Sequence, residues 1–286
     1  MQQPGRTTTP LPFPRVPSGK KSKQARRAAA LKPPPIQSKG APRRRQANPR
    51  VLAIGAAVVV LAAVGTTLGV VFSGGGNSTK GVPSIGSLAN GLPGASDVDA
   101  LYKGIPQQGL TLGWPSAPVT LVQYIDLQCP FCQEFETQVM PDILQKYVRT
   151  KKVKIETRVL DFLGSDSSRG RDAMVAAAQQ NKAYNFAELL YYNQGRENTG
   201  WLSDSMVAQT AASIPPLKVH ELLAARSTAA VTKQGPAFDK QAAADKVGGT
   251  PTLYVGKSGT KGKLVSLSSP TDTQTLVTTL DAALAG

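Results

Sequence analysis

Residues 119–132 read VTLVQYIDLQCPFC, and this stretch decides the fold. Its first seven residues are dense in β-branched and aromatic side chains, which predicts a buried strand over 119–125. From CPFC onward, apolar residues recur at spacings of three and four, which predicts a helix that opens at the motif. These residues are Phe131, Phe135, Val139, Ile143, Leu144 and Tyr147. Pro130 suits the first turn of that helix, where a missing N–H costs nothing, whereas Pro141 is expected to kink it.

The segments after this helix predict the rest of an α/β domain. Residues 154–160 alternate between polar and apolar side chains and predict a second strand, parallel to the first. Residues 168–247 then show mostly helical patterns. A hairpin and a final helix follow, with strands over 252–255 and 263–267 and the helix over 271–285. This order of elements predicts a thioredoxin-like fold that carries a helical insertion.

The positive charge of the chain is concentrated in its first fifty residues. The formal net charge is +15, but residues 1–50 hold thirteen Lys or Arg side chains and no Asp or Glu. The remainder carries twenty basic and eighteen acidic side chains, so it is close to neutral. Residues 1–50 are rich in proline and poor in large apolar residues, which predicts a disordered tail. We interpret its charge as a cytoplasmic flank rather than a surface for nucleic acid or lipid, and we expect no nucleic-acid partner.

An uncharged apolar stretch, VLAIGAAVVVLAAVGTTLGVVF, follows the tail over residues 51–72. As a helix it would be about 33 Å long, which matches a hydrocarbon core of about 30 Å. A cleaved signal peptide normally has a short basic region and an apolar core of about 7–15 residues, so we interpret 51–72 as a transmembrane signal anchor. With the basic side in the cytoplasm, the chain after Phe72 is expected to face outward from the cell membrane. Residues 73–96 are rich in Gly and Ser and predict a flexible tether, and 97–286 is expected to form the exported domain.

The chain has two cysteines, and they lie three positions apart. Structural zinc takes about four ligands, and His220 is the only histidine, so we expect neither a metal nor another cofactor. A disulfide between residues i and i+3 closes a tiny loop and gains little chain entropy, which disfavours a purely structural bridge. At a helix N-terminus, unpaired N–H groups and the helix dipole stabilise a thiolate. We therefore predict that Cys129 is an exposed nucleophile that forms mixed disulfides and that the less exposed Cys132 resolves them.

Three segments carry a resemblance to a known family. They are DLQCPFCQEFE at 126–136, the helical SSRGRDAMVAAAQQNKAYNFAELLYYNQ at 167–194, and VGGTPTLYVG at 247–256, whose Gly-Gly-Thr-Pro residues stand directly before a predicted strand. Together they resemble the DsbA family of exported thioredoxin-fold thiol–disulfide oxidoreductases, and in organisation its membrane-anchored actinobacterial members. The resemblance covers about 110–286 and implies that 97–286 is one DsbA-like domain, with its helical insertion at about 168–247.

The resemblance also implies roles for particular residues. Cys129 is the nucleophile, Cys132 is the resolving thiol, and Pro251 is a cis-proline beside them, with Thr250 offering backbone hydrogen bonds to an extended substrate. It implies exported cysteine-containing client proteins as substrates. It also implies a membrane oxidase or reductase that recycles the cysteine pair.

Four residues in or near the motif are candidates for tuning it, namely Pro130, Phe131, Asp126 and Glu136. Glu136 lies where the family often has an acid, and two interpretations stay open, tuning of the thiol and a solvated helix residue. For Asp126, a cap or loop role is favoured over that of proton acceptor for Cys132. Phe131 is a departure from the Pro-His pair of strongly oxidising DsbA proteins, because it neither donates a hydrogen bond nor carries charge. We hypothesise that the pKa of Cys129 lies above the value of about 3.5 known for DsbA and nearer the value of about 7 known for thioredoxin, which would make a weaker oxidant.

The leading functional hypothesis is an extracytoplasmic oxidoreductase that introduces disulfides into exported proteins. The first alternative reverses the chemistry, as a disulfide reductase or isomerase. The second is a copper-delivery module on the same fold, although such modules usually place three residues between their cysteines and add a histidine. The third is a redox-inert interaction domain that merely retains the motif.

Overall fold

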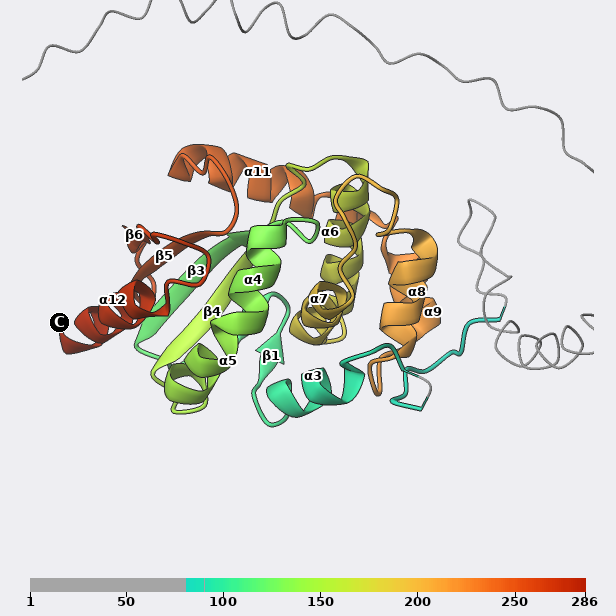
Figure 1. Cartoon of the computed structure of the whole chain (residues 1–286), viewed down its shortest axis with the longest axis horizontal. Coiled ribbons are helices and arrows are strands. Elements are labelled where there is room, and N and C mark those ends of the chain that lie inside the picture. Colours follow the sequence, from blue (N-terminus) through green and yellow to red (C-terminus); the bar gives the residue numbers. More distant parts are fainter. Residues whose placement is uncertain (1–80, 90) are drawn as a thin grey trace, which may run out of the picture. The chain divides into compact units, whose positions relative to one another are not determined.

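The computed structural model describes residues 81–89 and 91–286 (Figure 1). The expected tail at 1–50, the expected anchor at 51–72 and the first part of the expected tether lie outside these residues. Within the described ranges, every helix is too short or too polar to cross a membrane. The architecture below is that of the folded domain.

A six-stranded sheet forms the centre of the domain, in the order β1-β2-β4-β3-β5-β6. Strands β3 and β4 are parallel, as predicted, and β5 runs antiparallel to β3 on its other side. Strand β5 pairs in turn with β6 in the predicted hairpin. The strands are β1 (Gln107–Gln108), β2 (Thr111–Leu112), β3 (Val119–Ile125), β4 (Val153–Val159), β5 (Thr252–Lys257) and β6 (Lys263–Val265).

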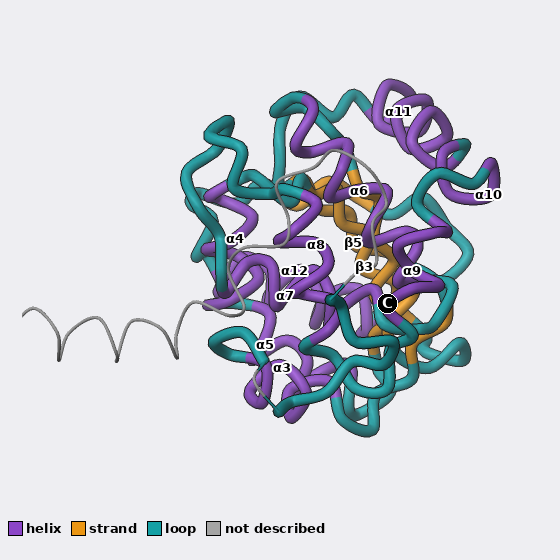
Figure 2. The backbone as a smooth tube through the Cα atoms, turned by 90° about the vertical axis from the view of Figure 1, so that its right-hand side faces the viewer, coloured by secondary structure: helices purple, strands orange, loops and turns teal. Residues whose placement is uncertain are grey.

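Strand β3 is the core strand, because six of its seven residues are buried. A strand buried along nearly its whole length is covered on both faces. Figure 2 shows the strands surrounded by helices. Strand β4 alternates between buried and half-buried residues. Both parallel strands end at the same edge of the sheet, and the residues that follow them meet there.

The helix after CPFC is broken where Pro141 was expected to kink it. Helix α4 (Pro130–Gln138) ends before Val139, and a short α5 (Met140–Ile143) and a π-helical turn (Leu144–Val148) continue it. Proline has no N–H to donate and clashes with the carbonyl of the preceding turn, which explains the break. The buried face of these segments carries the predicted apolar side chains, with the exception of Phe131, which is exposed.

The helical insertion follows β4, and Figure 1 shows helices α6 to α9 grouped on one side of the sheet, away from β5, β6 and α12. The final helix α12 packs against β5 and β3. The helices are α6 (Ser165–Ala178), α7 (Ala183–Tyr192), α8 (Asp204–Ala212), α9 (Val219–Ala225), α10 (Ala229–Thr232), α11 (Gln234–Asp245) and α12 (Thr273–Ala285). The fold class predicted from the sequence is confirmed for the domain.

Two elements before β3 extend the predicted fold. Strands β1 and β2 form a small antiparallel hairpin that adds to the edge of β4. Helix α3 (Ala95–Tyr102) packs against α7 of the insertion. The strands of the hairpin are two residues long, too short for an alternating pattern to reveal them.

The expectation of a flexible tether is wrong for the part of residues 73–96 that the structure describes. Residues 82–89 together with 91 and 92, which we call the strap, lie against the insertion. The amide of Gly86 donates to the Leu217 carbonyl at 2.8 Å, and that of Ser87 to the Ala212 carbonyl at 2.9 Å. Further along, the Leu92 amide donates to Ser213 Oγ at 2.9 Å. Backbone pairing of this kind needs little side-chain information, so a composition rich in Gly and Ser did not reveal it.

Replacing Gly86 with alanine should detach the strap. A Cβ at Gly86 would overlap the carbonyl oxygen of Ile214 and lie 2.7 Å from that of Ala211, and both oxygens belong to backbone. We expect the free energy of unfolding to fall by about 1–3 kcal/mol, measured by denaturant unfolding. Gly248→Ala is the control, because its added Cβ meets no atom within 4 Å. Equal stabilities of the two variants would contradict an attached strap.

Candidate active site

The CPFC motif lies in the turn between β3 and α4, at the edge where the parallel strands end. The Cys129 amide donates to the Asp126 carbonyl at 3.0 Å, which closes the turn. Cys129 is the N-cap of α4, with extended backbone angles, and Pro130 occupies the first helical position. The first N–H groups of a helix have no partner within it, so they are available to a sulfur at the N-cap.

The two thiols differ in their surroundings, although both are largely covered. Cys132 is fully buried in the first turn of α4, as predicted. Cys129 is 5% exposed, so the prediction of an exposed nucleophile is corrected to that of a nearly covered one. The segment before β5 lies over it, because Cys129 Sγ donates to the carbonyl oxygen of Thr250 at 3.3 Å.

The pKa values of the two thiols are shifted in opposite directions. The pKa of Cys129 is lowered to about 6, mainly by the hydrogen bond with Cys132 and also by hydrogen bonds with Thr250 and with the amides of Cys132 and Phe131, while burial acts in the opposite direction. Burial raises the pKa of Cys132 well above its ordinary value, and its hydrogen bond with Cys129 and the charge of that residue add to the rise. The pair therefore presents one thiolate and one thiol near neutral pH, which is the state that thiol–disulfide exchange requires.

The Thr250–Pro251 peptide bond is cis, as the resemblance implied. Strand β5 begins at Thr252 and pairs with β3, so the residues before β5 reach the end of β3 where Cys129 lies. The Thr252 hydroxyl donates to the Gly249 carbonyl at 2.7 Å and fixes this turn. Residues far apart in the sequence thus meet at one sulfur.

Asp126 is buried and holds loops together. Its carboxylate accepts hydrogen bonds from the Gln128 amide at 2.8 Å, the Leu163 amide at 3.1 Å and the Ser167 hydroxyl at 2.7 Å. Burial raises its pKa, and these three hydrogen bonds act in the opposite direction. The favoured interpretation as a loop residue agrees with this geometry, because the carboxylate ties the active-site turn to the loop after β4 and to the first turn of α6.

Glu136 is buried, so its interpretation as a solvated helix residue is wrong. It lies one turn after Cys132 on the buried face of α4, and Gln123 Nε2 donates to its carboxylate at 2.9 Å. Burial raises its pKa to about 8. A second buried carboxyl, Glu188 on α7, accepts a hydrogen bond from Tyr102 at 3.3 Å. Burial raises the pKa of Glu188 as well, and the charge of Glu136 adds to the rise.

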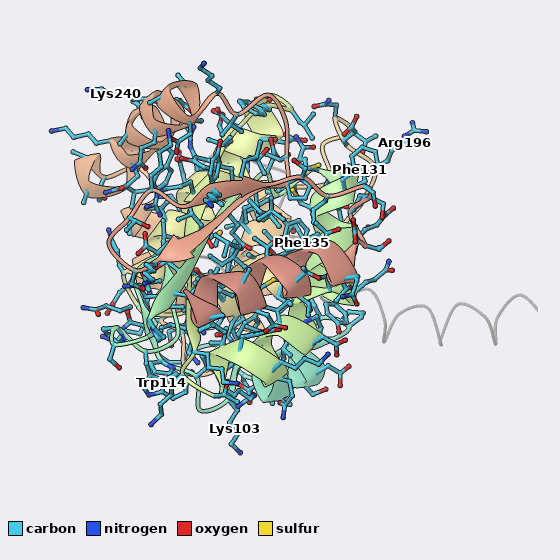
Figure 3. The ribbon with its side chains drawn as sticks, turned by 90° about the vertical axis from the view of Figure 1, so that its left-hand side faces the viewer. Lys103, Trp114, Phe131, Phe135, Arg196 and Lys240 are labelled. Atoms are coloured by element: carbon cyan, nitrogen blue, oxygen red, sulfur yellow. The ribbon has the colours of Figure 1, made fainter. Side chains whose placement is uncertain are left out.

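Two exposed aromatic side chains lie near the active-site turn. Phe131 is 56% exposed and Phe162, in the loop after β4, is 50% exposed. The backbone of the neighbouring Leu163 is hydrogen-bonded to the side chains of Asp126 and Gln128, so Phe162 stands beside the active-site turn. Figure 3 shows Phe131 and Arg196 at the same corner of the domain, with Phe135 further inside. Exposed aromatic side chains beside a reactive sulfur are suited to contact a polypeptide.

Metal binding finds no support among the described residues. They contain no group of three or more Cys, His, Asp or Glu side chains placed to hold an ion. His220 lies on α9, and its Nε2 is 3.0 Å from the carbonyl oxygen of Val82 in the strap. The histidine therefore packs the strap against the insertion.

Sequence reasoning missed three polar residues of this site. Gln128 and Gln194 bind the active-site turn to neighbouring loops, and Glu188 lies near Glu136 inside the domain. None belongs to a recognisable motif. Gln128 adjoins CPFC, which was a weak signal, whereas the other two come from the insertion and required the packing of α7 on α4.

Comparisons with known proteins agree with the fold. The thioredoxin family model matches residues 106–276, which is more than half of the chain. The chain belongs to the thioredoxin family. A probable disulfide bond formation protein D of Bacillus cereus is 26% identical over 148 residues, which cover 51% of this chain and 68% of that protein. The disulfide bond formation protein D of Bacillus subtilis is 26% identical over 152 residues, covering 50% and 66%.

Solved structures share the fold at lower identity. Oxidised BdbD from Bacillus subtilis superposes with a TM-score of 0.56 at 22% identity and covers 64% of this chain and 98% of its own. The alpha-DsbA1 of Wolbachia pipientis gives a TM-score of 0.52 at 19% identity, with coverages of 64% and 92%. These structures confirm the thioredoxin-like fold. The predicted thiol–disulfide oxidoreductase is confirmed by the relatives named above, the disulfide bond formation proteins.

The lowered pKa of Cys129 should appear as a pH-dependent stability of the reduced protein. A thiol whose pKa falls from 9.0 to about 6 on folding stabilises the folded state above pH 9, and this stabilisation is lost as the pH falls through about 6. The oxidised protein lacks the thiol, so we expect the stability of the reduced form relative to the oxidised form to rise with pH between about 6 and 9. Denaturant unfolding of both forms across this range, together with thiolate absorbance, measures the effect. A constant difference between the two forms would contradict it.

Proposed function

We propose that this protein introduces disulfides into exported cysteine-containing proteins through the Cys129–Cys132 pair. The observation that carries the proposal is the asymmetry of the pair, a stabilised thiolate at the N-terminus of α4 above a buried thiol. A sulfur that is stable as a thiolate is a good leaving group, so the oxidised pair passes its disulfide to a client readily.

The chemistry uses one client thiolate at a time. The first attacks Cys129 Sγ of the oxidised pair, the Cys129–Cys132 bond breaks, and Cys132 Sγ keeps the electron pair and takes up a proton. A second client thiolate then attacks the client sulfur of the mixed disulfide, and Cys129 leaves as a thiolate. The client loses two electrons and gains a disulfide, and the pair is left reduced.

The surroundings of Cys129 support a polypeptide as the substrate. Thr250 and Pro251 offer backbone beside the sulfur, where an extended client segment adds by main-chain hydrogen bonds. Phe131 and Phe162 offer exposed aromatic surface on the same edge of the domain. A client chain therefore finds both backbone and apolar contacts within reach of the reacting sulfur.

The direction of electron flow is part of the proposal. The names of the relatives, disulfide bond formation protein D, favour oxidation of clients. Phe131 favours a weaker oxidant, because it adds no hydrogen bond or charge to the thiolate. Reduction or isomerisation of client disulfides is the alternative, with a membrane oxidase or reductase recycling the pair in either case. Anchoring through residues 51–72, with the domain on the outer side of the cell membrane, completes the proposal.

Substituting Cys132 with alanine should trap the clients. Without the resolving thiol, mixed disulfides at Cys129 persist, and mass spectrometry of the captured species identifies both clients and the recycling partner. The Cys129→Ser, Cys132→Ala double variant is the control for non-specific capture. If the single variant retains no more partners than the double variant in an oxidising strain, the protein is a redox-inert domain and the proposal fails.

Placing histidine at position 131 should make the protein a stronger oxidant. An imidazole beside the sulfur donates a hydrogen bond and carries positive charge in acid, so the pKa of Cys129 should fall below its value of about 6. The reduced form becomes more stable, and the equilibrium with glutathione should shift toward the reduced protein. Phe162→His is the matched control, because Phe162 is similarly exposed but lies outside the motif. An unchanged thiolate titration in Phe131→His would refute the assignment of Phe131 as the residue that weakens oxidation.

A further inference from the structure

Two glutamine side chains join the active-site turn to the loop between α7 and α8, residues 193–203. One glutamine belongs to the loop and bonds to the turn, and the other belongs to the turn and bonds to the loop. Gln194 Nε2 donates to the carbonyl oxygens of Leu127, at 3.2 Å, and Cys129, at 3.3 Å. Gln128 Oε1 accepts from the amide of Asn198 at 3.0 Å. We call this pair of contacts the glutamine clasp. It connects the helical insertion directly to the backbone that carries the nucleophile.

The Gln128 side of the clasp continues into a third loop. Gln128 is fully buried, and its Nε2 donates to the Leu163 carbonyl at 3.3 Å and to Ser167 Oγ at 3.0 Å. The side-chain nitrogen of Gln128 is thus bonded to the loop after β4, while its side-chain oxygen accepts a hydrogen bond from the backbone amide of Asn198. The turn before Cys129 is fixed from two sides.

On the other side of the clasp, Gln194 is hydrogen-bonded to the backbone of the nucleophile Cys129. The Cys129 carbonyl also accepts from the Gln133 amide at 3.1 Å, which is the first hydrogen bond of α4. The orientation of this carbonyl sets the orientation of the whole N-cap residue. It therefore determines whether the sulfur lies within reach of the amides of Phe131 and Cys132 that lower its pKa.

We propose that Gln194 is a positioning residue of the redox site, whose side-chain amide holds the Leu127 and Cys129 carbonyls and thereby keeps the Cys129 sulfur at the N-terminus of α4. The inference rests on the proposed function, since it assigns Gln194 to the same reaction. Gln194 acts through the backbone, because its side-chain amide donates to the Leu127 and Cys129 carbonyls and not to a sulfur. Its loss should loosen the N-cap, destabilise the thiolate and weaken the oxidant.

A purely structural role for Gln194 makes a different prediction, and the chain offers a matched control for it. Gln133 Nε2 on α4 donates to the Tyr191 carbonyl on α7 at 2.8 Å. This bond joins the same two regions through the same chemical group, but the side chain of Gln133 is bonded to Tyr191 and not to Cys129. If Gln194 only docks the insertion on α4, loss of either glutamine side chain has the same effect.

The test compares Gln194→Met with Gln133→Met in the full-length protein. Methionine keeps the length of the side chain and removes its donors. In Gln194→Met we expect the thiolate midpoint of Cys129 to rise by about 0.5–1 pH unit, which is the size of one net hydrogen bond. We expect the equilibrium with glutathione to shift about three- to tenfold toward the oxidised protein. In Gln133→Met both quantities should stay at the wild-type values.

Other results have distinct meanings. Equal shifts in the two variants, or no shift in Gln194→Met, would overturn the positioning role. If Gln194→Met does not fold, Gln194→Asn replaces it, because the same amide on a side chain one methylene shorter falls out of reach, and the same shift is expected. A wild-type protein that neither exchanges with glutathione nor titrates near pH 6 would instead refute the proposed function.

Discussion

The placement of one sulfur at the beginning of a helix governs the rest of this structure. Cys129 lies at the N-terminus of α4, where amides without helical partners and the neighbouring thiol of Cys132 stabilise its thiolate. That placement requires β3 to end, the chain to turn and a helix to begin within a few residues. The burial of β3 on both faces fixes the strand, and the hydrogen-bonded turn before Cys129 fixes the direction of the helix.

The helical insertion supports this turn from the side. Tyr191 on α7 donates from its hydroxyl to the Asp126 carbonyl at 3.1 Å, the same oxygen that accepts from the Cys129 amide. Together with the glutamine clasp, this contact makes the insertion part of the site. This packing costs folding free energy, because it buries polar groups. Glu136 and Glu188 are both buried, and their pKa values are raised. One carboxylate oxygen of Glu188 has no hydrogen-bond partner among the described residues. Buried carboxyls of this kind destabilise a fold when ionised, so neutral forms are favoured here.

Sequence reasoning identified the parts of the fold whose pattern is local. The buried run of β3, the apolar stripe of α4 and the prolines at 130 and 141 each act on their own segment, and the structure agrees with them. The strap was misjudged because its attachment uses backbone groups near Gly86, which composition does not report. Glu136 and Gln194 needed long-range packing, because burial of the first and the contacts of the second depend on α7 lying beside α4. In the active site, the sequence alone therefore identified the CPFC motif, but it did not identify the residues that support the motif through long-range packing.

The lowered pKa of Cys129 results from groups that the fold holds around its sulfur. Its pKa of about 6 lies between the values of about 3.5 for DsbA and about 7 for thioredoxin. The groups that lower it are the Cys132 thiol, Thr250 and the first amides of α4, all of which the fold itself holds in place. The side chain at position 131 contributes only apolar surface, which is suited to a client chain rather than to the sulfur. In this protein the acidity of Cys129 is therefore set first by the Cys132 thiol and then by Thr250 and the first amides of α4, and the side chain of Phe131 is not among the groups that lower the pKa.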